Sequence, residues 1–160
     1  MNKSPFYICS LSGGKDSTAM LLRLLEENLP VDMILFCNTG LEFSDMYTHL
    51  DKLEKYIGRP IAKIKAEHSF DYYFSEIPIK RGNPEKFRAL FGKDYNGYGW
   101  MGVRMRWCTN RLKDQPRERF LRNLYKKYEI RQYVGIAADE KYRLERKNNQ
   151  RSDTHLWSGT

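Results

Sequence analysis

Cysteine is scarce in this sequence. Its 160 residues include three cysteines, Cys9, Cys37 and Cys108, and no two of them have the C-x-x-C spacing of a redox or zinc motif. Three thiols are too few for a disulfide framework or a self-contained four-cysteine cluster, so we expect no iron–sulfur cluster. Such cysteine usage suits a reducing compartment.

Long apolar runs are also missing. No stretch approaches the length of a membrane span, and residues 1–5 lead directly into a strand-like segment without the architecture of a signal peptide. We therefore expect a cytoplasmic protein without a membrane partner. With 41% hydrophobic and 14% aromatic residues, the composition is sufficient for one compact core.

Acidic residues are sparse in the last third of the chain. Residues 104–151 contain 15 Lys or Arg and 6 Asp or Glu, whereas residues 1–103 contain 13 of each sign. The excess of positive residues behind the net charge of +8 therefore lies in residues 104–151. This region is suited to attract a nucleic acid such as tRNA or DNA, or to focus a small phosphorylated substrate. A solvated basic face is the equally good alternative.

What the sequence does have is a glycine-containing loop between a strand and a helix. The apolar run 6–11 is followed by Ser12-Gly13-Gly14-Lys15-Asp16-Ser17, and an apolar-periodic helix begins near Ser17. Adjacent glycines let successive backbone N–H groups approach an anion, and the helix directs its positive dipole end to the same point. We therefore expect backbone N–H groups around Gly13, Gly14 and Lys15 to hold phosphates, with Lys15 neutralising charge. The hydroxyls of Ser10, Ser12 and Ser17 are expected to donate to phosphate oxygens.

The role of Asp16 has two interpretations. Its carboxylate can bind Mg²⁺ through water, because hard cations prefer oxygen ligands, or it can cap the helix and orient Lys15. Capping is slightly favoured. No metal site is expected beyond nucleotide-bound Mg²⁺, because the three histidines have no metal-binding spacing.

Two better-known phosphate loops are excluded. A Walker A loop requires Ser or Thr after Gly-Lys and a glycine five positions before Gly14, where this chain has Asp16 and Cys9. A dinucleotide fingerprint requires spaced glycines, and Gly13 and Gly14 are adjacent.

The segment pattern predicts an α/β fold in a single domain. Its first 65 residues alternate β-α-β-α-β, the skeleton of an open, mostly parallel twisted sheet with helices on both faces, as in Rossmann-like proteins. We expect strands at about 6–11, 32–37, 61–65 and 132–136. Helices are expected at about 17–28, 45–57 and 115–128. The second helix would have Ser44 as its N-cap and end at Gly58, and the third would have Pro116 in its first turn.

Two segments depart from this alternation. Residues 78–103 read as an irregular insertion rich in glycine and aromatic residues, serving either as a lid or substrate platform or simply packing on itself. Residues 141–160 read as a basic polar tail, either disordered or cut short. The nucleotide-binding domain is thus expected to be residues 1–140.

Four ordered segments carry a resemblance to a known family. The loop Ser12–Ser17 resembles the PP-loop of the adenine-nucleotide α-hydrolase (HUP-type) superfamily. Within this superfamily, three further segments are similar to segments of the PAPS reductase family: residues 36–43, 106–113 and 135–140. In the first of them, Asn38 stands in place of the usual acid. The resemblance implies a PP-loop fold and an adenine nucleotide, ATP or PAPS/APS, as ligand.

The same resemblance implies roles for individual residues. Asn38, Thr39 and Gly40 would border the nucleoside, and Gly135 would flank its other side. Arg106, Arg111, Lys113 and Arg143 are candidates for binding a second anionic group, and each has a solvated surface position as its alternative. Cys108 is a weak catalytic candidate, because a thiolate near Arg106 and Arg111 is suited to sulfur transfer.

The chain departs from the sulfite-forming reductases in one respect that limits function. These enzymes resemble one another in a C-terminal catalytic cysteine, and here no cysteine follows Cys108. The leading hypothesis is therefore an enzyme that acts at the α-phosphate of ATP and releases pyrophosphate, in some cases for sulfur transfer. The alternatives are a non-catalytic nucleotide-binding module of a nucleic-acid-modifying or defence assembly, and a reductase remnant. The chain is either a small homologue or part of a longer protein.

Overall fold

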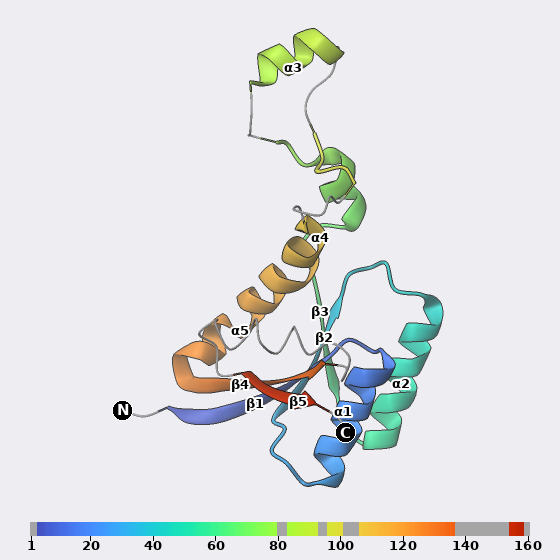
Figure 1. Cartoon of the computed structure of the whole chain (residues 1–160), viewed down its shortest axis with the longest axis vertical. Helices are drawn as coiled ribbons and strands as arrows, with labels where there is room; N and C mark the ends of the chain where they lie inside the picture. Colours follow the sequence, from blue (N-terminus) through green and yellow to red (C-terminus); the bar gives the residue numbers. More distant parts are fainter. Residues whose placement is uncertain (1–2, 80–82, 93–95, 101–105, 137–153, 159–160) are drawn as a thin grey trace.

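The structure is a computed structural model that describes residues 3–79, 83–92, 96–100, 106–136 and 154–158. Its centre is a five-stranded sheet in the order β3-β2-β1-β4-β5, in which every pairing is parallel (Figure 1). The strands are β1 (Ser4–Leu11), β2 (Met33–Asn38), β3 (Ile61–Lys65), β4 (Tyr128–Ile136) and β5 (Thr154–Ser158). The expected open parallel α/β fold is confirmed.

The strand order places a topological switch point between β1 and β4. From β1 the chain builds outward to β2 and β3, and then returns to the other side of β1 to add β4 and β5. Connections diverge at this point, so a crevice opens at the carboxyl ends of the two central strands, where such sheets bind ligands.

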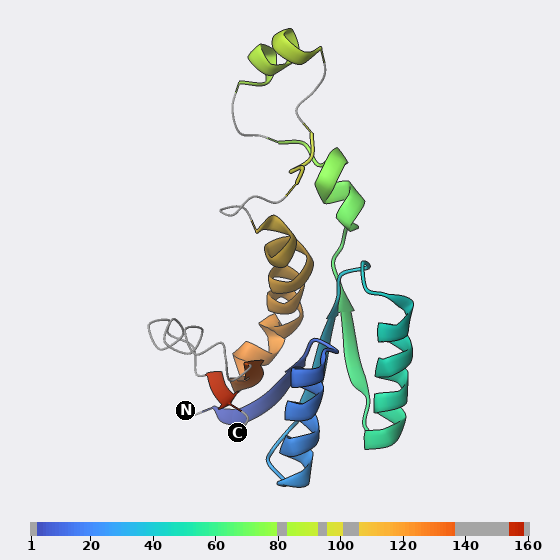
Figure 2. The ribbon, with the colours of Figure 1, turned by 45° about the vertical axis from the view of Figure 1, so that its right-hand side comes forward.

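Helices cover both faces of the sheet. Figure 2 shows α1 (Lys15–Glu26) and α2 (Ser44–Ile57) on one side and α5 (Gln115–Lys127) on the other. Because both faces are covered, the central strands bury alternate side chains in different cores: Cys9 packs with Met20 and Leu50, whereas Ile8 packs with Leu35 and Leu121.

Helix boundaries correct two expectations. Helix α1 starts at Lys15, before Ser17, so Lys15 and Asp16 belong to its first turn. Ser44 is the first residue of α2 and not its N-cap, which is Phe43. The stop at Gly58 is confirmed, because this residue has a left-handed φ of 63° at the C-cap.

The expected polar tail contains a strand. Thr154–Ser158 forms β5 and pairs in parallel with β4, from Gln132 opposite Thr154 to Ile136 opposite Ser158. The sequence pattern does not predict this strand. Residues 137–153 lie outside the described part of the chain.

The insertion is more regular than expected. It contains α3 (Pro84–Phe91), which projects away from the sheet, and it follows the π-helical turn η1 (Tyr72–Glu76) (Figure 1). Backbone hydrogen bonds from Gly97, Tyr98 and Gly99 to carbonyl oxygens of residues 73–77 fasten its far end to η1.

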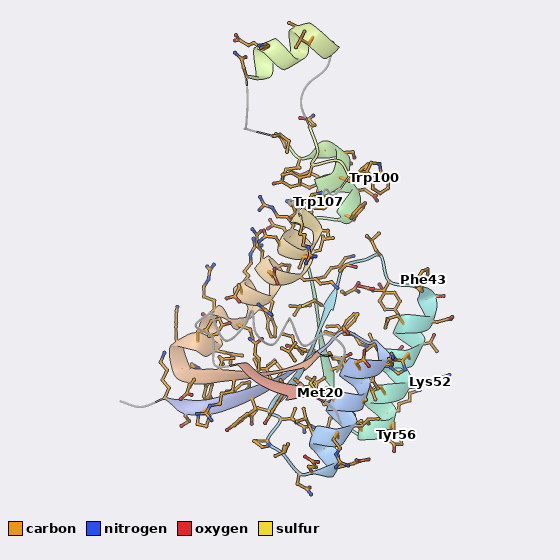
Figure 3. All side chains as sticks on the ribbon, viewed as in Figure 1. Met20, Phe43, Lys52, Tyr56, Trp100 and Trp107 are labelled. Atoms are coloured by element: carbon orange, nitrogen blue, oxygen red, sulfur yellow. The ribbon has the colours of Figure 1, made fainter. Side chains whose placement is uncertain are left out.

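Trp107 joins the insertion to the rest of the chain. Its ring lies 5.6 Å from that of Tyr98 and 5.2 Å from that of Phe70, and its Nε1 donates to the Gly99 carbonyl at 3.1 Å. Figure 3 shows Trp107 and Trp100 at the junction with the projecting segment. Tyr98 thus packs against residues outside the insertion, whereas Trp100 is 80% exposed.

Trp107 also begins a long helical segment. Helix α4 (Trp107–Thr109), the π-helical turn η2 (Asn110–Asp114) and α5 follow without a break. A π-helical turn adds a residue to the helix and rotates the side chains on either side of it relative to each other. Side chains of this segment therefore reach two different cavities, described below.

Candidate nucleotide-binding site

The loop between β1 and α1 presents an uncapped helix N-terminus. Gly14 is the N-cap, with φ −76° and ψ 166°, and no side chain accepts a hydrogen bond from the first turn. The N–H groups of this turn have no carbonyl four residues earlier in the helix, so they are available to an anion. This is the arrangement expected for a phosphate site.

Gly13 is required by the geometry of the turn. Its φ of +80° is rarely adopted by other residues, and a Cβ atom here would lie 2.2 Å from Sδ of Met46 in α2. The loop therefore passes close against the beginning of α2.

The two serine hydroxyls of the loop are engaged within it. Ser17, 6% exposed, donates from Oγ to the Gly14 carbonyl at 3.0 Å and accepts from the Ser12 backbone at 3.2 Å. The two Oγ atoms are 2.9 Å apart, and because the Ser17 proton is directed to Gly14, Ser12 is the donor of that bond. These hydroxyls brace the loop, and the expected donation from Ser12 and Ser17 to phosphate oxygens stays a prediction.

Lys15 and Asp16 project from the first turn. Their charged atoms are 3.9 Å apart, and the side chains are 93% and 53% exposed. The N-cap of α1 is Gly14 and not Asp16, which lies in the first turn, so the capping part of the favoured interpretation is wrong. The carboxylate of Asp16 does lie beside Lys15, and its function stays a prediction. The Lys15 side chain thus extends into solvent, and its expected role at the phosphates stays a prediction.

The turn after β2 is held by its own side chains. Oδ1 of Asn38 accepts from the Gly40 backbone at 2.8 Å and from the Tyr47 hydroxyl at 2.9 Å, and Oγ1 of Thr39 donates to Oε1 of Glu42 at 2.7 Å. This turn therefore has a fixed shape, and Glu42, held by Thr39, lines the cavity described next.

A cavity of about 370 Å³ lies at the switch point, between the loop, the ends of β1 and β4, and the first turn of α5. Its lining residues are Ser10, Leu11, Ser12, Gly14, Asp16, Ser17, Leu35, Cys37, Glu42, Thr109, Lys113, Asp114, Arg117, Val134 and Gly135. We call it the loop cavity. It brings together residues from β1, β2, β4, α1 and the η2–α5 segment.

Gly135 of β4 lies against the first turn of α1, and its expected role beside the nucleoside stays a prediction. A Cβ atom there would lie 3.4 Å from the Asp16 carbonyl oxygen and from Cα of Ser17, so β4 and α1 pack closely at this point. An added methyl group would therefore just fit in ordinary van der Waals contact with α1.

Two buried polar atoms of the loop cavity lack partners. Among the described side chains that are not exposed, Oγ of Ser10 and Nε of Arg117 are the buried nitrogen or oxygen atoms without a hydrogen bond. Buried polar atoms are normally paired, and both residues line the same cavity, one on each wall. They are therefore positioned to hydrogen-bond a polar ligand between them.

Not all candidate residues lie at this cavity. Its lining includes neither Lys15 nor the turn 38–40, and of the candidate anion-binding residues it includes Lys113 but not Arg106 or Arg111. Arg111 instead lies at a second cavity, and Arg143 lies outside the described residues.

Sequence reasoning missed four polar residues of the lining. Three of them, Thr109, Asp114 and Arg117, come from the helical segment, and Glu42 follows β2. Thr109, Lys113 and Arg117 are four residues apart, so a helical reading extended back to Trp107 would have grouped them on one face.

Comparison with known proteins identifies the family. The family model of the phosphoadenosine phosphosulfate reductase domain matches residues 7–88, just over half of the chain. The chain belongs to this family. It is therefore a member of the PP-loop superfamily, whose loop is Ser12–Ser17 here.

Relatives of this PP-loop protein are longer. Two uncharacterized proteins of Methanocaldococcus jannaschii are 26% and 29% identical over 96% and 92% of the chain, which covers 27% and 31% of their lengths. An uncharacterized 37.8 kDa protein of Escherichia phage 186 is 38% identical over 41% of the chain and 19% of its own length. The chain thus spans less than a third of each of these relatives.

The cysteines of this family member have distinct surroundings. Burial raises the pKa of Cys9 to about 12. Burial likewise raises the pKa of Cys37, which lines the loop cavity, although Arg117 and Lys113 oppose the rise. Cys108 packs against the aromatic cluster around Trp107 and is not part of the cavity lining.

The described ranges contain neither a cluster of metal ligands nor a helix suited to a membrane. Within them, no three His, Cys, Asp or Glu residues are placed to hold a metal ion together. No helix there combines the length and apolar character needed to cross a membrane.

Proposed function

We propose that the chain binds ATP, or the related nucleotides PAPS or APS, in the loop cavity and acts at the α-phosphate. The observation that supports this most directly is the uncapped N-terminus of α1, facing a cavity whose opposite wall carries Lys113 and Arg117. Backbone N–H groups and two cations on opposite sides form a site for a polyphosphate chain.

Each wall has a separate task in this proposal. The first turn of α1 and Lys15 hold the outer phosphates, and Arg117, with an unpaired Nε, donates to the α-phosphate region. Oγ of Ser10 lies at the end of β1 and supplies a further hydrogen bond. These donors are fixed before reaction, which is the condition for stabilising charge that develops in a transition state.

The residues of the site fit a nucleotide-bound Mg²⁺. Asp16 and Glu42 place carboxylate oxygens at the cavity, and Mg²⁺ in such sites is typically held by phosphates and one or two carboxylates. When bound, the ion would neutralise phosphate charge.

The reaction at the α-phosphate balances without a redox partner. An acceptor oxygen, water in the simplest case, forms a bond to the α-phosphorus while the bond to the bridging oxygen breaks. Pyrophosphate leaves with the electron pair of that bond, and the proton of the acceptor passes to solvent. The product is AMP, or an adenylylated acceptor.

Pyrophosphate release tests the proposal. With ATP and Mg²⁺, Lys15→Ala is expected to lower AMP and pyrophosphate formation about 100-fold, the scale of losing one transition-state donor. Lys52→Ala, which removes an exposed lysine from α2 (Figure 3), is the matched control and should retain the wild-type rate.

Binding measured in the same samples separates the alternatives. Titration with ATP, PAPS and APS ranks the nucleotides. Tight binding without pyrophosphate release would select the non-catalytic nucleotide-binding module, and equal turnover by both lysine variants would overturn the assignment of the loop.

A further inference from the structure

A second cavity lies across the η2–α5 segment from the loop cavity. It has a volume of about 410 Å³ and is lined by Lys63, Ile64, Lys65, Glu67, Tyr73, Arg111, Gln115, Pro116, Arg119 and Phe120. Strand β3 is an edge strand of the sheet, so this cavity opens at the side of the molecule. We call it the edge cavity.

Arg111 is held in the edge cavity with its charge uncompensated. Its guanidinium donates to Oε1 of Gln115 at 3.0 Å and to the Tyr98 hydroxyl at 2.8 Å, and it lies 5.9 Å from the Tyr73 ring centroid. These partners are neutral, and within the described residues no carboxylate pairs with Arg111. The result is an oriented cation suited to a phosphate group.

The positive surface continues from the edge cavity along α5. Arg119, Arg122 and Lys126 are spaced by three and four residues, so they share one exposed face of the helix, opposite buried Leu121. We call these three residues the α5 ridge; with a rise of 1.5 Å per residue it is about 10 Å long.

Little negative charge opposes this ridge. Helix α5 contains five Lys or Arg and the single acid Glu118, and Arg122 and Lys126 form no ion pair with any described residue. Arg119 pairs with Glu67 at 2.7 Å, but both side chains are about 60% exposed, so the pair is readily exchanged for a phosphate.

An aromatic ring lies where the ridge meets the cavity. Phe120 follows Arg119, is 44% exposed and lines the edge cavity. An exposed aromatic ring beside a line of cations is the arrangement by which proteins bind single-stranded nucleic acid, with bases stacked on rings and phosphates on cations.

We propose that the edge cavity and the α5 ridge bind a single strand of nucleic acid. The phosphates of the strand contact Arg119, Arg122, Lys126 and Arg111, and one base enters the cavity to stack on Phe120. A small anion would fill the cavity and leave the ridge unused. A flat anionic membrane would contact the ridge but would not enter the cavity.

Fluorescence anisotropy with a labelled 20-nucleotide DNA or RNA strand tests the proposal on the 160-residue chain. Binding by wild type should weaken with salt, as phosphate contacts require. The triple variant Arg119→Gln/Arg122→Gln/Lys126→Gln should lose at least tenfold in affinity, and its salt slope should decrease by about two, since each single-strand contact contributes about 0.7. Its matched control, Arg23→Gln/Lys52→Gln/Lys55→Gln, has the same net charge and should bind like wild type.

A second variant and a second probe complete the test. Phe120→Ala should weaken single-strand binding and leave duplex binding unchanged, because bases in a duplex are already stacked. The proposal is overturned if wild type does not bind at 50 mM salt, if both triple variants weaken equally, or if anionic lipid vesicles are bound as tightly as the strand.

Pyrophosphate release without nucleic acid, measured in parallel, keeps this inference separate from the nucleotide activity. If the protein turns over ATP but binds no strand, only the proposal that the α5 ridge binds nucleic acid is contradicted. A chain that binds the strand but does not turn over ATP contradicts only the proposed function.

Discussion

The hydroxyls of Ser12 and Ser17 are hydrogen-bonded at 2.9 Å across the loop between β1 and α1. Ser17 also bonds to the Ser12 backbone and to the Gly14 carbonyl. One nearly buried hydroxyl therefore fixes both sides of the loop and holds the N–H groups of the first turn of α1 in place, as the proposed phosphate site requires.

Removing this hydroxyl should affect both stability and binding. Ser17→Ala leaves the polar partners of the hydroxyl without it, so we expect a loss of about 2 kcal/mol in the free energy of unfolding and weaker nucleotide binding. Urea denaturation and nucleotide titration measure the two effects. Ser44→Ala, at an exposed position that makes no side-chain cap, should change stability by less than about 0.5 kcal/mol. Equal effects of the two substitutions would show that Ser17 does not brace the loop.

Gly97 should be intolerant of any side chain. Its φ is +73°, and an added Cβ would lie 2.1 Å from the Phe74 carbonyl oxygen, which is backbone and cannot move aside. Gly99 has a similar φ of +64° but open space around it. Gly99→Ala should therefore cost about 1 kcal/mol from backbone strain alone, and Gly97→Ala about 2 kcal/mol more from the clash.

Denaturation followed by tryptophan fluorescence reports this difference, since Trp100 and Trp107 lie at the affected junction. If the two alanine variants unfold at the same urea concentration, the insertion is not fastened to η1 through Gly97.

Much of the fold is local enough to be predicted from sequence. Strands β1 to β3 are apolar or alternating runs between clear turn residues, and α2 ends at a glycine with left-handed φ. The apolar pattern starts α1 two residues too late, because Lys15 and Asp16 are polar and exposed in its first turn and therefore carry no apolar periodicity.

The far wall of the site could not be predicted in the same way. Arg117 reaches the loop cavity only because α5 packs over β1 and β2 through contacts such as Leu121 with Ile8 and Leu35. Strand β5 likewise depends on pairing with β4, and its own five residues carry no strong strand pattern. Both features are set by long-range packing, which local propensity does not encode.

Arg117 is expected to contribute to nucleotide binding. Arg117→Ala removes a cation whose Nε is buried and unpaired at the cavity, so nucleotide affinity should fall at least tenfold, the effect of losing a charged hydrogen bond. The change is measured by isothermal titration with ATP. Arg23→Ala removes an exposed arginine from the last turn of α1, at the end of the helix away from the cavity, and should leave the affinity unchanged. If Arg117→Ala binds ATP as tightly as wild type, Arg117 of α5 does not contribute to nucleotide binding.

The stability of the protein should fall in alkaline solution because of Cys9. Folding raises the pKa of this thiol from the ordinary 9.0 to about 12, so between these values the unfolded chain loses the proton while the folded chain keeps it. The protonated thiol therefore contributes its full share to the free energy of unfolding below about pH 9. This contribution is lost as pH rises toward 12, by up to about 1.4 kcal/mol per pH unit.

Comparison with Cys9→Ala isolates this effect from other groups that titrate at high pH. The variant is less stable at pH 8 because it leaves a small cavity in the core, but its disadvantage should shrink as pH rises from 9 to 10.5. Urea denaturation of both proteins at several pH values measures the difference. A difference that stays constant over this range would mean that Cys9 ionises in the folded protein as readily as in the unfolded chain.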